Sequence, residues 1–324
     1  MLRRNLIGES ASFRQAVEQI QQVARHDVTV LLQGETGTGK ELFARALHYL
    51  SPRQDSAFVP VNCGSIPDSL FENELFGHQQ GAYTDARSRQ IGMVSRANGG
   101  TLFLDEVDTL SLRSQAAMLR FLESQQFTPL GSQTTERGNV RIVAATNANL
   151  IECAERGQFR SDVLFRLDLL SIRIPPLHER TGDAELLAEH FLDYYSKHYG
   201  VERKALEPGT RAGIAQYTWP GNVRELQNWI QKYLLLNEPP AIDSPGAEET
   251  SSTECFSLAK TRAIADFEKR YLTELLRRTQ GNVTKAARIA AKDRSALGKL
   301  LKKHRIDWRA YRACRQPVPT SRSS

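Results

Sequence analysis

Short apolar, β-branched runs alternate with helical patterns in the first half of the chain. The runs that predict strands lie at residues 28–33, 58–62, 101–105, 140–145 and 169–174. Between them apolar residues recur at helical spacing, as in the stretch 110–121. Strands alternating with helices predict a parallel sheet covered on both faces, so the fold class expected here is α/β.

The pattern changes on both sides of this region. Phe13, Val17, Ile20 and Val23 stand at helical spacing, which predicts an amphipathic lead-in helix. After Pro175 and Pro176 only helical periodicity remains. We therefore expect an α/β domain over residues 1–175 and a helical lid over 176–238, with no N-terminal sensory domain.

A polar, proline-rich segment at residues 239–254 predicts a linker to a separate C-terminal module. That module, residues 255–312, is expected to be all-α. Its first helix, at about 258–279, carries Ile264, Phe267, Tyr271 and Leu275 on one face. A break at Gly281 and Asn282 precedes two short basic helices, and residues 313–324 are expected to be a disordered tail.

Charged residues are distributed unevenly along the chain, and their distribution indicates a class of partner. Residues 255–315 contain 17 Lys and Arg against 5 Asp and Glu, whereas the rest of the chain contains 26 against 32. A basic module on a mildly acidic body indicates a polyanion partner for that module. A solvated basic face is the alternative that charge alone leaves open.

Composition excludes several other classes. The chain is 324 residues long, 40% hydrophobic and 25% charged, which is ordinary for a soluble protein. No apolar run approaches the roughly 20 residues of a membrane helix, and the first residues lack the apolar core of a signal peptide, so a cytoplasmic location is expected. Cys63, Cys153, Cys255 and Cys314 are far apart, which indicates reduced thiols rather than a zinc site or disulfides.

A glycine-rich turn follows the first predicted strand. Gly34, four further residues, Gly39 and Lys40 fit the P-loop pattern, in which backbone N–H groups and a lysine hold phosphates. Glu41 stands where a Ser or Thr usually contacts Mg²⁺. A plain glycine turn with a surface lysine is the alternative, but a strand before the turn and an amphipathic stretch after it favour phosphate binding.

A second acidic motif follows a later strand. Residues 99–106 form a buried-strand pattern that ends in Asp105 and Glu106, the form of a Walker B motif. Asp105 could hold Mg²⁺, and Glu106 could polarise the water that attacks a γ phosphate. The alternative is the polar exit of a buried strand. The P-loop earlier in the same α/β pattern favours the catalytic interpretation.

These residues carry a resemblance to a known family. The segments GETGTGKE, ELFGHQQGAYTDA, GGTLFLDE, VRIVAATN, FRSDVLFRL, IPPLHER and WPGNVREL occur in the order found in bacterial enhancer-binding proteins. Over residues 5–238 the chain therefore resembles the AAA+ domain of sigma-54-dependent activators of the nitrogen-regulator-C class. In that family Glu is common after the P-loop lysine.

The resemblance implies an ATPase that uses ATP and Mg²⁺. Asn62 would hold Glu106 away from water, and Asn147 would sense the γ phosphate. Arg160 and Arg166 would be arginine fingers that act on the nucleotide of a neighbouring subunit, which implies a ring like a hexamer. The nucleotide contacts that the resemblance implies are Gly34, Glu35, Thr36, Gly37, Thr38, Gly39, Lys40, Glu41 and, from the lid, Arg224.

The resemblance also assigns a polymerase contact. Gly81, Ala82, Tyr83, Thr84, Asp85 and Ala86 occupy the place of the family's GAFTGA loop, which contacts sigma-54. Tyr83 for Phe is a mild change, whereas Asp85 for Gly adds a charge and removes access to positive φ. A second hairpin-like insertion at about 127–138 is expected beside this loop.

Residues 281–290, followed by the basic segment 294–304, resemble a Fis-type helix-turn-helix. Ala286, Ala287 and Ile289 suit close helix packing. The helix before them would pair two modules on a palindromic double-stranded DNA site, although a stripe that faces the core of one module is the alternative. The predicted DNA-binding donors are Lys285, Arg294, Ser295, Lys299, Lys302 and Lys303.

The function expected from this resemblance is ATP-driven activation of sigma-54 RNA polymerase from upstream DNA. Two alternatives stay open: an AAA+ protein-remodelling motor, and a family-derived DNA-binding regulator that does not act through sigma-54, for which Asp85 is the reason. A separate regulatory protein that binds the ring is a further expected partner.

Overall fold

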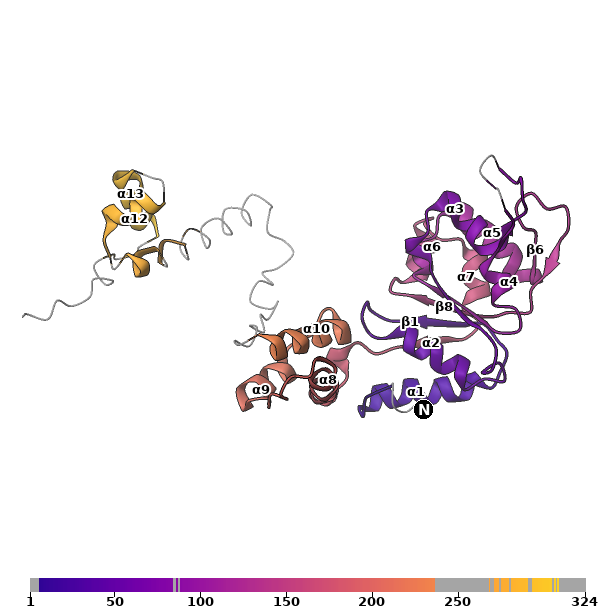
Figure 1. Cartoon of the computed structure of the whole chain (residues 1–324), viewed down its shortest axis with the longest axis horizontal. Coiled ribbons are helices and arrows are strands. Elements are labelled where there is room, and N and C mark those ends of the chain that lie inside the picture. Colours follow the sequence, from indigo (N-terminus) through magenta and orange to yellow (C-terminus); the bar gives the residue numbers. More distant parts are fainter. Residues whose placement is uncertain are drawn as a thin grey trace, which may run out of the picture. The chain divides into compact units, whose positions relative to one another are not determined.

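The protein is described here from a computed structural model of the whole chain (Figure 1). Residues 6–83, 86, 88–236, 268, 271–273, 275–279, 281–290, 293–304, 306 and 308 are described. The chain divides into two compact units, Met1–Ser244 and Pro245–Ser324. The expected linker at 239–254 and tail at 313–324 lie outside the described residues.

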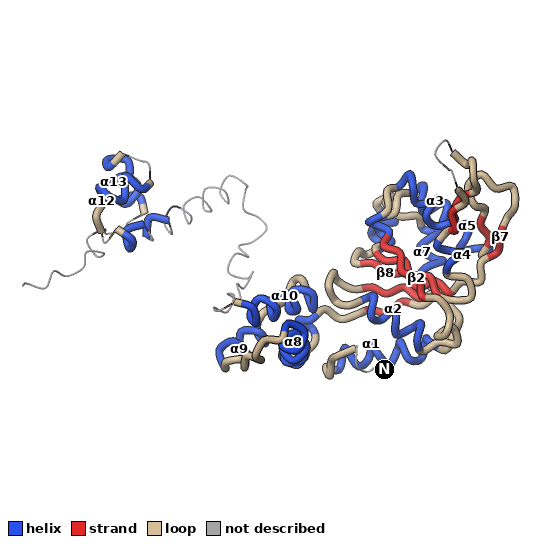
Figure 2. Tube along the Cα trace, in the orientation of Figure 1, coloured by secondary structure: helices blue, strands red, loops and turns tan. Residues whose placement is uncertain are grey.

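A five-stranded parallel sheet forms the centre of the first unit, in the order β2-β5-β8-β1-β9. The strands are red in Figure 2. Its strands coincide with the predicted apolar runs, so the predicted α/β class is confirmed. Their bounds are Val30–Gln33 for β1, Phe58–Asn62 for β2, Thr101–Asp105 for β5, Arg141–Thr146 for β8 and Ser171–Arg173 for β9.

Successive strand residues face opposite sides of the sheet, and both sides are buried. Figure 1 shows α1 and α2 on one side of the sheet and α3, α5, α6 and α7 on the other. Leu32, Phe103 and Val143 belong to the buried cluster on the first side, and Leu31 and Leu104 belong to the cluster on the second. The covering helices are α1 Ala11–Ala24, α2 Lys40–Tyr49, α3 Asp68–Phe76, α4 Met93–Arg96, α5 Leu112–Ser124, α6 Leu150–Glu155 and α7 Ser161–Leu167. Two short 3-10 turns follow strands of the sheet, η2 Cys63–Ser65 after β2 and η3 Val107–Thr109 after β5.

Two small antiparallel hairpins project from this domain. The first pairs β3 Gly77–His78 with β4 Gln90–Ile91, and the second pairs β6 Gln126–Phe127 with β7 Glu136–Arg137. They lie side by side, since the Leu130 N–H donates to the Gly77 oxygen at 2.9 Å and the Gln79 N–H donates to the Leu130 oxygen at 2.9 Å. The expectation of a second insertion beside the first is confirmed.

Only helical elements occur between residue 177 and residue 236, as predicted for the lid. They are η4 Leu177–Glu179, α8 Asp183–Tyr199, α9 Pro208–Gln216 and α10 Asn222–Leu235. Trp219 and Leu226 are in the lid's own core. Asp183 ties the lid to the N-terminal segment, because its buried carboxylate pairs with Arg180 at 2.9 Å and accepts the Ser10 hydroxyl at 2.9 Å.

The second unit has a small apolar core. Leu272, Leu275 and Leu276 pack against α12 Val283–Ile289 and α13 Arg294–Lys303. Ala286 and Ala287 are buried as predicted, but Ile289 is 56% exposed, so its assignment to the helix contact was wrong. Ile289 ends the short helix on the side away from this core.

The predicted apolar stripe before the helix-turn-helix is only partly described. Leu275 is buried, whereas Tyr271, predicted on the same face, is 44% exposed. The buried face is formed instead by Leu272, Leu275 and Leu276, which pack within one module. Ile264 and Phe267 lie outside the described residues.

Candidate functional site

The phosphate loop connects β1 to α2 at the carboxyl edge of the sheet. Gly37 and Gly39 have φ of 81° and 95°, in the left-handed region that glycine enters without steric cost. Lys40 is a buried residue, and its ammonium donates to the Gly34 oxygen at 2.8 Å and the Glu35 oxygen at 3.1 Å. The loop therefore closes around its own lysine.

Lys40 faces the acidic end of β5. Burial lowers the pKa of Lys40, and the charges of Asp105, Asp108 and Glu106 oppose that shift. Burial likewise raises the pKa of Asp105, and Lys40 opposes it. Each group thus offsets part of the other's desolvation, which holds a cation and a carboxylate together at the place where phosphates and a metal ion would meet.

Glu106 leaves the strand in an unusual backbone conformation. Its φ is 56°, its N–H donates to Asp105 Oδ1 at 3.0 Å, and its carbonyl accepts the Thr109 hydroxyl at 2.7 Å. A non-glycine residue in this region is held there by its surroundings and is typical of functional sites. The Glu106 carboxylate lies beside Gly64, which follows β2.

The Glu106 and Asn62 side chains meet above Gly64. A Cβ on Gly64 would stand 2.8 Å from Glu106 Oε2 and 3.4 Å from Asn62 Oδ1. Asn62 Oδ1 accepts the Ser65 N–H at 3.0 Å, which caps η2. The sequence thus placed both residues in one neighbourhood, while the restraint of Glu106 by Asn62 stays a prediction.

Cys63 lies behind these acidic groups as a buried free thiol. Burial, with added effects of Asp105, Asp108 and Glu106, raises the pKa of Cys63 to about 12. The thiol therefore stays protonated at neutral pH. Within the described residues no cluster of three or more His, Cys, Asp or Glu could hold a metal ion.

Asn147 follows β8 and reaches the phosphate loop. Its Nδ2 donates to the Thr36 hydroxyl at 3.0 Å. Residues that follow β1, β5 and β8 thus meet at one edge of the sheet. The role of Asn147 as a phosphate sensor stays a prediction.

The lid contributes a contact that the sequence interpretation missed. Asn222 Nδ2 donates to Glu35 Oε2 at 2.9 Å and to the Thr36 oxygen at 3.1 Å. Asn222 lies inside the quoted segment WPGNVREL, but only Arg224 was singled out there. The sequence held a clue to this residue: Asn222 follows Gly221 at a helix start, and asparagine adopts positive φ more often than most residues.

Arg224 lies two residues further along α10. Its side chain is exposed, and its Cβ lies 3.2 Å from where a Cβ on Gly37 would stand. Arg224 therefore lies beside the phosphate loop. Its predicted contact with nucleotide, as second sensor, stays a prediction.

Arg160 and Arg166 are both exposed at α7. Arg160 donates two hydrogen bonds to Asp162, at 3.0 and 2.8 Å, which raise the pKa of Arg160. Arg166 lies 3.6 Å from Glu123. In the described part of the chain neither guanidinium bonds a phosphate-loop residue. Because both side chains are exposed, both could contact another copy of the chain. Their action in trans stays a prediction.

A cavity of about 330 Å³ adjoins the phosphate loop. Thr38, Gly39 and Leu42 form its loop side, and Leu6 and Ile7 of the N-terminal segment line another part. Phe191 and Val223 close it from the lid. The cavity is thus a largely apolar space shared by three segments that the sequence analysis treated separately.

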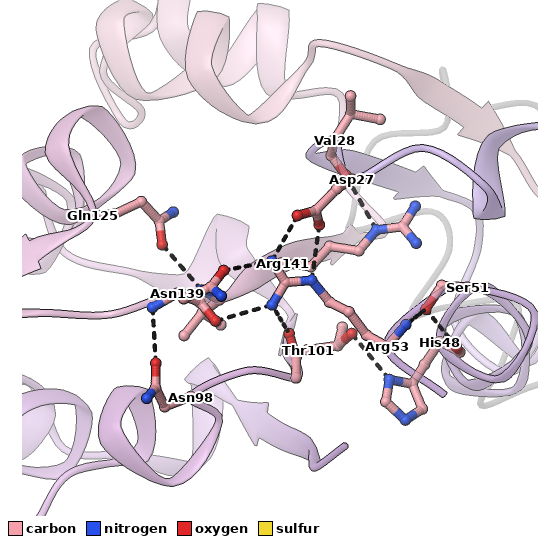
Figure 3. Close-up of polar contacts among 12 residues, drawn as sticks. Asp27, Val28, His48, Ser51, Arg53, Asn98, Thr101, Gln125, Asn139 and Arg141 are labelled. Atoms are coloured by element: carbon pink, nitrogen blue, oxygen red, sulfur yellow. Dashed lines mark hydrogen bonds and ion pairs between the residues drawn. The ribbon is translucent and has the colours of Figure 1, made fainter. Parts of the chain in front are cut away.

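A larger polar cavity of about 610 Å³ lies at the opposite, amino end of the strands. Figure 3 shows the polar contacts among residues around it. There Arg53 pairs with Asp27 at 2.6 Å and also donates to the Asn139 oxygen at 2.9 Å. The buried Arg141 donates to the carbonyls of Ala24 and Val23 at the end of α1. Because these groups bind backbone and one another, we interpret this network as structural.

Gly81, Ala82, Tyr83 and Ala86 lie between β3 and β4 of the first hairpin. Gly81 has φ of 81°, and its N–H donates to the Ala86 oxygen at 2.8 Å. Tyr83 is 46% exposed, with its ring 5.1 Å from that of His78. The second hairpin supports the loop, since a Cβ on Gly131 would stand 2.7 Å from Ala82 Cβ. Thr84 and Asp85 lie outside the described residues.

The predicted DNA-binding donors are exposed on α12 and α13: Lys285, Arg294, Lys299, Lys302 and Lys303. Lys303 also pairs with Glu268 at 2.9 Å, so its charge is partly compensated within the module. The Ser295 side chain lies outside the described set. DNA contact by individual residues stays a prediction.

Comparisons with known proteins cover most of the chain. Residues 6–173 match the sigma-54 interaction domain family, and residues 178–246 match the AAA+ ATPase lid domain family. Residues 263–304 match the Fis family of bacterial regulatory proteins.

Individual relatives agree. The chain is 40% identical to the transcriptional regulatory protein GlrR of Escherichia coli, over 94% of this chain and 69% of the relative. It is 38% identical to the DNA-binding transcriptional regulator NtrC of the same organism, over 92% and 70%. A crystal structure of NtrX from Brucella abortus in complex with ATP aligns with a TM-score of 0.71 at 32% identity, over 92% of this chain and 69% of that one.

Proposed function

The chain belongs to the sigma-54 interaction family of AAA+ proteins, and from this premise we propose that it is an ATPase that activates transcription. The observation that carries the proposal is the meeting of three motifs at one sheet edge: the phosphate loop after β1, Asp105–Glu106 after β5 and Asn147 after β8. Each comes from a different strand of the same sheet.

The residues of this edge have separable tasks in ATP hydrolysis. The loop N–H groups and Lys40 would bind the phosphates, for which Lys40 exchanges its present bonds to Gly34 and Glu35. Glu106 would orient and polarise the attacking water. Mg²⁺, which binds proteins through one or two carboxylates with phosphates and water, fits Asp105 and would neutralise developing phosphate charge.

The cavity beside the loop is proposed as the site of the nucleotide base. Its wall of Leu6, Ile7, Leu42 and Phe191 suits a flat apolar ring, and it opens beside Thr38 and Gly39. The buried Arg180–Asp183 pair fixes the N-terminal segment against the lid at this place, since Arg180 donates to the Ile7 oxygen at 2.8 Å. Base binding would thus join lid and sheet domain.

A ring of subunits, proposed to be a hexamer, would complete the site. Arg160 and Arg166 would each approach the nucleotide of a neighbouring copy and stabilise charge on the transferred phosphoryl group. Both side chains are exposed, and within the described residues they pair with Asp162 and Glu123 rather than with their own phosphate loop, which supports this arrangement. The interface would be head-to-tail, as a closed ring requires.

Two further proposed contacts, with RNA polymerase and with DNA, would couple ATP hydrolysis to transcription. The exposed Tyr83 loop is proposed to contact sigma-54 RNA polymerase, and the basic α12–α13 module to bind upstream double-stranded DNA in the cytoplasm. Dimerisation through the C-terminal module and a separate regulatory protein are further proposed partners. Among the described helices none is long and apolar enough to cross a membrane.

In vitro transcription from a sigma-54 promoter tests the proposal. Native protein with ATP should produce open complexes, and Glu106→Gln should bind ATP but lose hydrolysis and open-complex formation by at least about 100-fold, as expected for loss of a water-polarising group. Open complexes and phosphate release are measured on the same samples.

Asp85→Gly is the matched variant for the polymerase contact. If native protein hydrolyses ATP but gives no open complexes while Asp85→Gly gives them, the sigma-54 assignment is wrong for the natural sequence. The protein would then be a regulator that works without sigma-54.

A further inference from the structure

Asn222 occupies an unusual position at the start of α10. Its φ is 52°, and its side chain is fully buried. Its Oδ1 accepts the Leu177 N–H at 2.6 Å, while its Nδ2 donates to Glu35 and to the Thr36 oxygen. The acceptor and both amide hydrogens are therefore all in use.

These bonds join three segments. Leu177 begins the connection from β9 into the lid, Glu35 and Thr36 belong to the phosphate loop, and Asn222 itself begins α10. Asparagine is one of the few non-glycine residues that enter the left-handed backbone region, and it persists there where its surroundings hold it. The three bonds supply that restraint.

The same turn of the lid lies directly against the loop. A Cβ on Gly37 would stand 2.2 Å from the Gly221 oxygen and 3.2 Å from Arg224 Cβ. The Gly221 N–H is in turn held by Glu225 Oε2 at 2.8 Å. The place from which Arg224 projects is thus fixed relative to the loop through Gly221 and Asn222.

Arg224 itself has no such restraint. No described residue accepts a hydrogen bond from its guanidinium, and its charge adds to burial in lowering the pKa of Lys40. A long side chain without bonds depends on its backbone for its position. What fixes the backbone of this turn therefore decides where the Arg224 charge lies.

Thr36 is held from two sides. Asn147 from the sheet donates to its hydroxyl at 3.0 Å, and Asn222 from the lid donates to its carbonyl. The middle of the phosphate loop is consequently shared by the sheet and the lid.

We propose that Asn222 is a positioning residue that fastens the lid to the phosphate loop and so sets Arg224 over the bound phosphates. The inference rests on the proposed ATPase function. Asn222 does not touch nucleotide; it acts through Arg224.

The test compares variants in the full chain by the dissociation constant of a fluorescent ATP analogue and by kcat and KM. Asn222→Asp keeps the acceptor for Leu177 but replaces the donor with a carboxylate that faces Glu35. We expect the dissociation constant and KM to rise about tenfold, the scale of a lost hydrogen bond to a charged group. Asn222→Gly accepts the left-handed φ and lacks all three bonds, so it should weaken binding to a similar degree.

Two double variants separate positioning from general stability. Adding Asn222→Asp to Arg224→Ala should raise the dissociation constant of Arg224→Ala by less than about twofold. Both changes remove the same interaction, that of Arg224 with the bound phosphates. Combining Asn222→Asp with Glu35→Gln restores the bond between positions 222 and 35 with reversed roles, although the bond to the Thr36 oxygen stays lost. Measured against Glu35→Gln alone, this double variant should lose less affinity than Asn222→Asp loses against native protein.

The inference is overturned if Asn222→Asp and Asn222→Gly bind the analogue as native protein does. It is also overturned if their losses add fully to that of Arg224→Ala, or if only the thermal unfolding midpoint changes. Native protein that binds the analogue without hydrolysing ATP would instead refute the proposed ATPase, and the binding measurements would still decide the role of Asn222.

Discussion

At the scale of single residues, the candidate site depends on backbone conformations that few residues adopt. Gly37 and Gly39 turn the loop, while Glu106 and Asn222 adopt left-handed φ despite their side chains. At Gly37, Glu106 and Asn222 a specific bond or close approach accompanies the conformation. The site is therefore set by how closely separate segments approach, and not only by the side chains that bear charge.

Gly37→Ala and Gly39→Ala test how closely the lid approaches the phosphate loop. Both variants bear the cost of a left-handed alanine, about 1–2 kcal/mol. A methyl group at Gly39 meets nothing nearer than 3.8 Å, whereas one at Gly37 meets the Gly221 oxygen at 2.2 Å. Gly37→Ala should therefore lower the unfolding midpoint of nucleotide-free protein further and raise KM for ATP further. Equal effects of the two variants would show that the lid does not rest on the loop in solution.

At the scale of elements, two hairpins and two short helices carry the proposed partner contacts. The β6–β7 hairpin supports the Tyr83 loop through backbone bonds and the close approach of Gly131 to Ala82. In the C-terminal unit, α13 presents its basic residues from a helix with a glycine in its middle. Gly298 is exposed, and nothing lies within 4 Å of a Cβ added there.

Gly298→Ala should stabilise α13, since alanine is favoured over glycine in a helix by about 1 kcal/mol. Amide hydrogen exchange in peptides from residues 283–303, read by mass spectrometry, should slow about fivefold in that variant. Gly281→Ala is the matched control and should speed exchange, because Gly281 is buried with φ of 74°. Unchanged exchange in Gly298→Ala would mean that helix propensity does not limit the stability of α13.

At the scale of the whole molecule, one chain holds both halves of an active site that we propose it cannot assemble alone. The phosphate loop and Glu106 lie at one edge of the sheet, and Arg160 and Arg166 are paired with Asp162 and Glu123 elsewhere. We therefore propose that a neighbouring copy completes the site.

Mixing two inactive variants tests this arrangement. Glu106→Gln subunits lack the catalytic carboxylate, and Arg160→Ala subunits lack a finger, so each alone should hydrolyse ATP at least about 100-fold more slowly than native protein. In a mixture, some sites combine an intact Glu106 with a neighbour's intact Arg160, and ATPase activity should reappear. Activity of native protein should also fall on dilution. A mixture as inactive as its components, with native activity per subunit constant on dilution, would argue against action in trans.

The sequence by itself determined the strands, the lid helices and the order of the motifs, because apolar periodicity and glycine spacing are local properties. These patterns singled out Lys40, Asp105 and Glu106, whereas the family resemblance added Asn147, and the structure brings all four to one sheet edge. The sequence could not determine contacts that depend on how distant segments pack. The Asn222 bonds to the phosphate loop, the cavity shared with Leu6, and the exposure of Ile289 were decided only by tertiary structure, since each reflects the approach of segments that no local pattern encodes.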